Sequence, residues 1–171
     1  MPMVLKAIIM AGFLLGNPSS DLPTVEEVDL NRYSGLWYEI ARLPNSFERG
    51  LECVTATYTL KSSGKVEVLN KGFSAKKGKF KSSRGRAWVP DENEPGRLKV
   101  SFFWPFAGNY YIISLDTDYQ YALVGDPSRE YLWVLSRTKT LDEAIYAELL
   151  STARTHGFAT EQLVRVQHNC K

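Results

Sequence analysis

Short alternating segments separated by turn residues run through most of this 171-residue chain. Apolar and polar positions exchange with a period of two, which is typical of strands with one buried face. The pattern predicts strands at about 36–44, 52–61, 65–73, 80–89, 97–103, 109–116, 119–125 and 130–137. Tight turns between consecutive strands make them antiparallel neighbours. We therefore predict an all-β fold, an eight-stranded antiparallel up-and-down barrel with room for one small ligand.

A helical period begins only near residue 140. Thr140 and Glu143 have the spacing of a capping box, which predicts a C-terminal α-helix from this point. A stripe of apolar side chains at four-residue spacing should dock this helix on the outside of the barrel: Ile145, Leu149 and Ala153. A short alternation at 163–167 predicts one extra strand.

The alternation also assigns side chains to the interior of the barrel. The inward set combines aromatic and small residues, and small residues facing aromatic ones leave a cavity, although a fully packed core is the alternative. We expect the cavity to be lined by Glu39, Ala41, Val54, Ala56, Tyr58, Val68, Asn70, Gly85, Ala87, Val100, Phe102, Tyr110, Ile112, Tyr131 and Trp133. Glu39 is either a carboxylate satisfied by a nearby arginine or tyrosine, or a polar anchor for the head of a ligand.

One end of the barrel has a candidate plug. Gly35 allows a sharp turn, Trp37 follows at the start of the first strand, and Arg137 ends the last strand. A guanidinium stacked on the indole contributes roughly 0.5 to 2 kcal/mol. We expect these three residues to hold the closed end rather than the ligand.

The connections after the first, third, fifth and seventh strands share the opposite end, the mouth. One of them exposes Phe103, Trp104 and Phe106 where polar turn residues are usual. Another bears a basic run that includes Lys76, Lys77 and Lys79. A solvated face is the ordinary interpretation of the lysines, but together the two loops predict either peripheral docking on an anionic membrane or a mouth-to-mouth homodimer.

The composition of the chain gives little reason to expect nucleic-acid binding, metal binding or catalysis. A net charge of +2 gives no reason to expect a nucleic-acid partner, and with only two histidines the chain offers no metal site, catalytic site or cofactor motif. Residues 1–16 resemble a secretory signal peptide, 17–28 form a polar tether, and 29–171 form a single domain. Export favours a disulfide between Cys53 and Cys170 over two free thiols.

Three motifs carry a family resemblance: Asn31-x-x-x-Gly35-x-Trp37-Tyr38, then Thr117-Asp118-Tyr119, then Arg137. In order and distance they resemble the signature blocks of the lipocalins, and the chain around them is most similar to bacterial outer-membrane lipocalins and, further off, to apolipoprotein D. The resemblance implies an eight-stranded calyx that binds fatty acids or lysophospholipids, with a Cys53–Cys170 bridge as in apolipoprotein D-like members. It places the protein in the outer membrane or the periplasm. Asn17 stands where bacterial lipoproteins carry their lipidated cysteine, which allows a secreted soluble form.

Two functions compete at this point. The first is non-enzymatic binding and transport of a lipid. The second is an isomerase or another enzyme for a lipophilic substrate, with Glu39 and Tyr58 as acid and base. The lack of inward histidine and cysteine favours the carrier.

Overall fold

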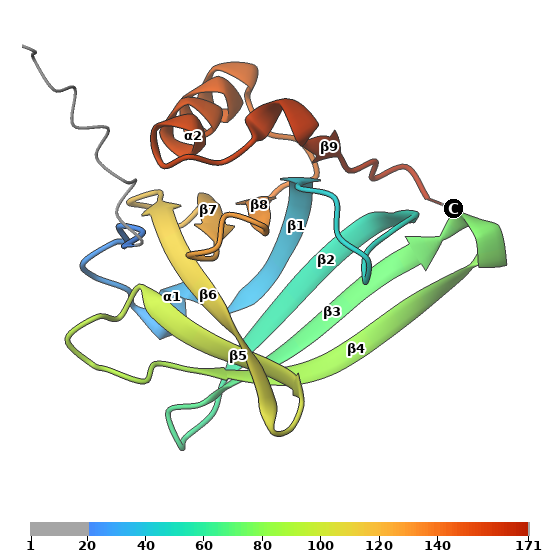
Figure 1. Cartoon of the computed structure of the whole chain (residues 1–171). Helices are drawn as coiled ribbons and strands as arrows, with labels where there is room; N and C mark the ends of the chain where they lie inside the picture. Colours follow the sequence, from blue (N-terminus) through green and yellow to red (C-terminus); the bar gives the residue numbers. More distant parts are fainter. Residues whose placement is uncertain (1–20, 171) are drawn as a thin grey trace, which may run out of the picture.

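Eight antiparallel strands close into a barrel in the computed structural model, which describes residues 21–170 (Figure 1). Each strand pairs with its neighbours in the sequence, and β1 pairs with β8 to complete the ring. The eight-stranded up-and-down barrel predicted from the alternation is therefore confirmed. The strands are β1 (Gly35–Arg42), β2 (Leu51–Leu60), β3 (Val66–Ser74), β4 (Lys79–Trp88), β5 (Arg97–Phe103), β6 (Phe106–Leu115), β7 (Tyr121–Gly125) and β8 (Leu132–Ser136).

One edge of β1 is shared by two partners. Its first half pairs with β2, from Gly35 opposite Tyr58 to Tyr38 opposite Thr55. Its end pairs with β9 (Val164–Arg165), the predicted extra strand, which is shorter than expected. The C-terminal segment therefore pairs with the edge of β1 that is left free where β1 and β2 separate near the mouth.

The C-terminal helix α2 (Glu143–Thr155) covers the outside of the barrel beside β1, β7 and β8 (Figure 1). Leu149 and Ala153 are buried against the barrel and Ile145 is partly buried, as the stripe predicted. The predicted start at Thr140 is wrong. Asp142 is the N-cap, because its Oδ1 accepts hydrogen bonds from the backbone N–H groups of Ala144 (2.8 Å) and Ile145 (3.2 Å).

The segment before β1 is more structured than its sequence indicated. Leu22 is fully buried in the cluster beneath α2, and Val25 N–H donates to the carbonyl of Ile112 (2.9 Å). Residues 21–28 therefore pack on the barrel instead of forming a tether. A one-turn helix, α1 (Leu30–Tyr33), then leads into β1. Two 3-10 turns complete the described elements: η1 (Ala75–Lys77) and η2 (Thr160–Gln162).

The signal-like segment 1–16 and Asn17 lie outside the described residues. Within residues 21–170, no helix is both long enough and apolar enough to cross a lipid bilayer.

Candidate ligand-binding site

The closed end is built on Trp37, whose side chain is fully buried. The guanidinium carbon of Arg137 lies 3.9 Å from the centroid of the indole, and the indole N–H donates to the carbonyl of Tyr33 (2.8 Å). Gly35 has φ of +101°, and a Cβ at this position would meet Arg137 Nη1 at 3.3 Å. A side chain at residue 35 would therefore disturb both the turn and the arginine.

Arg137 also fastens three separate segments to one another. Its side-chain N–H groups donate to the carbonyls of Tyr119 (3.1 Å), Leu36 (3.0 Å), Arg32 (2.7 Å) and Tyr33 (3.3 Å). The segments belong to α1, β1 and the β6–β7 turn, so the arginine holds this end of the barrel shut. The predicted geometry of the closed end agrees with the structure.

Above the indole, three tyrosine hydroxyl groups form a chain inside the barrel. Tyr110 is in the middle, with its hydroxyl 2.7 Å from that of Tyr33 and 2.8 Å from that of Tyr58. Burial raises the pKa of all three phenols, so they remain neutral at ordinary pH. The chain gives the barrel interior a polar, uncharged spot that can both donate and accept hydrogen bonds.

Most of the predicted wall residues share the interior cluster. Trp37 and Tyr33 are buried in this cluster, whereas Ala56, Val100, Phe102, Tyr110 and Trp133 are only partly buried. Phe102 lies over Gly85, where a Cβ would meet its ring at 2.8 Å, so this glycine makes room for the aromatic side chain. The predicted residues in the interior cluster are Ala56, Tyr58, Val68, Ala87, Val100, Phe102, Tyr110, Ile112 and Trp133.

Two further predicted residues lie along the wall near the mouth. Asn70 pairs with Ala56 across β2 and β3, and its Oδ1 atom is buried without a hydrogen-bond partner among the described residues. A buried acceptor left in this way costs about 1 to 3 kcal/mol unless a donor reaches it. Val54 is buried and lies close to Gly72 on the neighbouring strand.

The prediction for Ala41 is wrong about the face. A bulge in β1 leaves Ile40 unpaired between Glu39, opposite Leu135, and Ala41, opposite Val134. The extra residue reverses the alternation, so Ala41 is buried beneath α2. For the same reason Arg42 joins Glu39 on the inner side.

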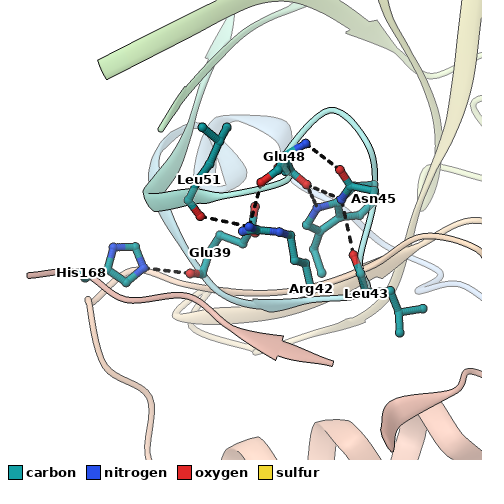
Figure 2. A network of polar contacts seen from close by, with 8 residues as sticks. Glu39, Arg42, Leu43, Asn45, Glu48, Leu51 and His168 are labelled. Carbon is teal, nitrogen blue, oxygen red and sulfur yellow. Dashed lines mark hydrogen bonds and ion pairs between the residues drawn. The ribbon is translucent and has the colours of Figure 1, made fainter. Parts of the chain in front are cut away.

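A buried polar network occupies the mouth beside β1 (Figure 2). Arg42 donates to Glu39 Oε1 (2.6 Å) and to the carbonyls of Glu48 (2.9 Å) and Leu51 (3.0 Å). The Glu48 carboxylate accepts from Asn45 Nδ2 (2.6 Å), which also holds the loop between β1 and β2. Arg42 pairs with the Glu39 carboxylate, while the Glu48 carboxylate accepts only from neutral donors among the described residues, so the network holds one acidic group more than its single guanidinium can neutralise. Burial, with the nearby Glu48 carboxylate as the second cause, raises the pKa of Glu39 well above its usual value.

Aromatic rings extend this network at the rim. Trp133 Nε1 donates to Glu48 Oε2 (3.0 Å), and the indole stacks beside Tyr131 with ring centroids 5.9 Å apart. Phe47, from the loop between β1 and β2, lies against both rings, at 5.8 Å from Tyr131 and 6.5 Å from Trp133. Tyr131 is thus a rim residue rather than part of the deep wall.

The two candidates for acid and base lie in different networks. Glu39 is bonded to Arg42 and Tyr58 to Tyr110. No hydrogen bond joins the two side chains among the described residues, although after burial the Glu39 carboxylate is one of the causes that raise the pKa of Tyr58. Among the described residues, no cluster of three or more histidine, cysteine, aspartate or glutamate side chains is arranged to hold a metal ion.

The disulfide between Cys53 and Cys170 is present, with Cα atoms 6.2 Å apart. It fixes the C-terminal segment along β1 and β2 on the outside of the barrel. Cys53 N–H donates to the carbonyl of Gln167 (2.7 Å), and a ring nitrogen of His168 lies 2.8 Å from the carbonyl of Glu39 (Figure 2).

The aromatic residues between β5 and β6 are exposed, as expected. Phe103 is 79%, Trp104 72% and Phe106 78% exposed. Lys76 and Lys77 in η1 and Lys79 at the start of β4 are exposed as well.

Sequence reasoning missed several residues of this site. Tyr33 lies in a polar turn, where no periodicity indicates a buried side chain. Arg42 faces the interior only because of the bulge, and Glu48 lies in an irregular loop. One signal was available for Arg42: a second charge three residues after Glu39, in a strand otherwise apolar, suggests an internal ion pair.

Comparison with known proteins identifies relatives. Residues 28–168 match the lipocalin-like domain. The chain is 44% identical over 166 residues to outer membrane lipoprotein Blc of Vibrio cholerae, covering 96% of each chain. It is 35% identical over 157 residues to apolipoprotein D of Bos taurus, covering 86% of this chain and 82% of that one. The crystal structure of the cockroach allergen Per a 4 superposes with a TM-score of 0.68 at 26% identity, covering 88% of this chain and 96% of that one. The match to the lipocalin-like domain agrees with the eight-stranded barrel and with the stacked Trp37 and Arg137 at its closed end. The chain therefore belongs to the lipocalin family.

Proposed function

We propose that the protein is a non-enzymatic carrier that holds one lipid molecule, a lysophospholipid or a long-chain fatty acid, inside the barrel. The observation that carries this proposal is the inner wall, which is lined mainly by apolar side chains, closed at one end by Trp37, and includes wall residues that are only partly buried. An acyl chain entering from the mouth would contact Tyr58, Tyr110 and Trp133. Burying ten methylenes would contribute roughly 8 kcal/mol before the ordering costs of binding are subtracted.

Asn70 adds a reason to expect a polar group on the ligand. Its unpartnered Oδ1 lies on the wall next to Ala56 and requires a donor. A lysophospholipid hydroxyl or a protonated fatty-acid carboxyl would supply one. This supports a lipid with a donor group near its head.

The names of the relatives support a location in the cell envelope. The Vibrio cholerae relative is called an outer membrane lipoprotein. We extend this to the present chain as a location in the outer membrane or the periplasm, with Asn17 in place of a lipidated cysteine favouring release as a soluble protein. The exposed aromatic residues and Lys76, Lys77 and Lys79 support contact with a membrane at the mouth, and a mouth-to-mouth homodimer is the competing arrangement.

Displacement of a fluorescent fatty acid tests the carrier proposal. Ala56→Trp fills the cavity from the inner face of β2, and Thr57→Trp places the same side chain one residue later on the outer face. We expect Ala56→Trp to weaken binding at least tenfold and Thr57→Trp to leave it within twofold, with thermal melts showing that both variants fold. Equal affinity in the two variants, together with no lipid found by mass spectrometry of the purified wild type, would exclude carriage in the barrel.

A further inference from the structure

A hollow of about 410 Å³ lies on the outer wall of the barrel, between the β2–β3 turn and the β5–β6 turn. Both turns lie along the bottom of the view in Figure 1. Lys61 and Lys65 flank the first turn, and Trp104 extends from the second. The turns belong to opposite ends of the barrel, so the hollow follows the wall and is separate from the mouth.

The floor of the hollow is the outward face of β3 and β4. Glu67 pairs with Arg86, and Leu69 pairs with Arg84. The alternate residues Val66, Val68 and Ala87 belong to the interior cluster, so the charged residues between them must point outward. The hollow is therefore distinct from the barrel interior, which lies on the other side of the same strands and is the site proposed for the lipid.

Positive charge dominates this hollow. Lys61, Lys65, Arg84 and Arg86 line it with a single carboxylate, Glu67. Glu67 lies 3.5 Å from Lys61 and 3.7 Å from Arg84, both at exposed sites where ion pairs contribute little. An excess of three positive charges therefore remains, and Arg84 and Arg86 lie two residues apart on one strand, where both can reach the same anion.

Exposed apolar side chains stand directly beside this charge. We call Phe103, Trp104 and Phe106 the aromatic tip; Trp104 lines the hollow, and the two phenylalanines have no polar atom to hydrogen-bond with a partner. The basic run expected to act with the aromatic tip, Lys76, Lys77 and Lys79, does not line this hollow. The cations next to the tip are a different set.

We propose that the hollow binds the phosphate of an anionic lipid headgroup while the aromatic tip enters the apolar layer of the same bilayer. The proposal deepens the membrane contact proposed above and rests on it. Charge complementarity selects the headgroup, and the apolar tip selects a bilayer over a soluble anion. The protein then docks on the side formed by β3, β4 and the β5–β6 turn, and the mouth stays at the edge of the contact.

Vesicle co-sedimentation of the full chain tests this arrangement, with phosphatidylcholine vesicles that contain or lack about one-third phosphatidylglycerol. We expect Arg84→Gln with Arg86→Gln to lower partitioning onto the anionic vesicles about 30-fold, the change that corresponds to about 1 kcal/mol for each basic residue near the surface. The matched control, Arg49→Gln with Lys139→Gln, removes the same charge from two exposed positions outside the hollow and should change partitioning less than threefold. Phe103→Ser with Phe106→Ser should also weaken binding.

Four outcomes would overturn the proposal. Equal loss in the two charge variants would mean that overall charge, not the hollow, attracts the protein. Equal binding to vesicles with and without phosphatidylglycerol would show that the protein does not recognise an anionic headgroup. Release by 10 mM inorganic phosphate at constant ionic strength would assign the hollow to a soluble anion. A change of solution mass in the tip variant, with vesicle binding intact, would make a second copy of the chain the occupant.

Failure here is distinguishable from failure of the carrier proposal. Arg84 and Arg86 lie on the outside of the wall, so their variants should bind the fluorescent fatty acid with the same affinity as the wild type. If the wild type binds the fatty acid but not the anionic vesicles, only the docking proposal fails. If it binds the vesicles but not the fatty acid, only the carrier proposal fails.

Discussion

Removal of the Arg137 side chain should open the closed end of the barrel without removing the ligand site. In Arg137→Ala, the indole of Trp37 loses the guanidinium 3.9 Å from its centroid, and four carbonyl groups lose a donor. Because Arg137 lies below the tyrosine chain, at the end opposite the mouth, none of the groups expected to contact a lipid is changed directly.

The cost follows from those contacts. A partly desolvated cation–π pair contributes about 1 to 2 kcal/mol. Hydrogen bonds from a charged donor contribute more than neutral ones, but Arg137 is only partly buried, so water can replace several of them. Together the losses amount to about 3 kcal/mol. For a chain of this length, that lowers the melting temperature by roughly 6 to 12 °C.

Thermal unfolding followed by circular dichroism gives the shift, and fatty-acid displacement at a temperature well below the transition gives the affinity. Arg137→Lys is the matched control, since it keeps the charge but loses the flat stacking group and the forked donors. We expect it to recover less than half of the lost stability. A variant with normal melting and at least tenfold weaker lipid binding would refute this reasoning, because the arginine would then belong to the ligand site.

Three other changes test other parts of the fold. Replacing Cys53 and Cys170 by serine should cost about 4 to 5 kcal/mol, as expected for a bridge that closes a segment of 117 residues, and a chemical denaturation curve measures it. Tyr110→Phe removes the central hydroxyl of the chain and should destabilise by about 1 to 3 kcal/mol, more than Tyr58→Phe, which removes a terminal one; equal effects would argue against the chain. Glu39 has a raised pKa in the folded state, so wild type should lose stability relative to Glu39→Gln as pH rises from about 4.5 through the folded value, and parallel pH profiles of the melting temperature would contradict this.

The strand order was predictable because antiparallel strands with one buried face carry their alternation openly. Predicted and observed bounds differ by only a few residues, and the closed end followed from Gly35, Trp37 and Arg137. These features depend on local patterns: a period of two, a turn glycine, and a cation at the end of the last strand.

The errors come from features that no periodicity contains. The bulge at Ile40 exchanges the faces of Ala41 and Arg42, because one unpaired residue reverses every later position in the strand. α1 spans one turn, too short for a helical period, and the Thr140–Glu143 spacing of a capping box predicts a helix start two residues before the actual N-cap, Asp142. The polar network at the mouth depends on that bulge and on an irregular loop, so it could be found only in three dimensions.

That network is hard to explain by stability alone. Placing two carboxylates and a guanidinium in a buried site requires their removal from water, and well-packed apolar residues are often at least as stable in such positions. An apolar cluster, however, tolerates several arrangements of the loop between β1 and β2. Arg42 does not, because it binds Glu39 in β1, the Glu48 carbonyl before the turn and the Leu51 carbonyl at the start of β2. Since Glu48 also accepts from Trp133 in β8, the loop, the inner wall and the rim are fixed to one another. We interpret the network as the element that gives the mouth a single shape, at the one place where β1 and β2 no longer pair.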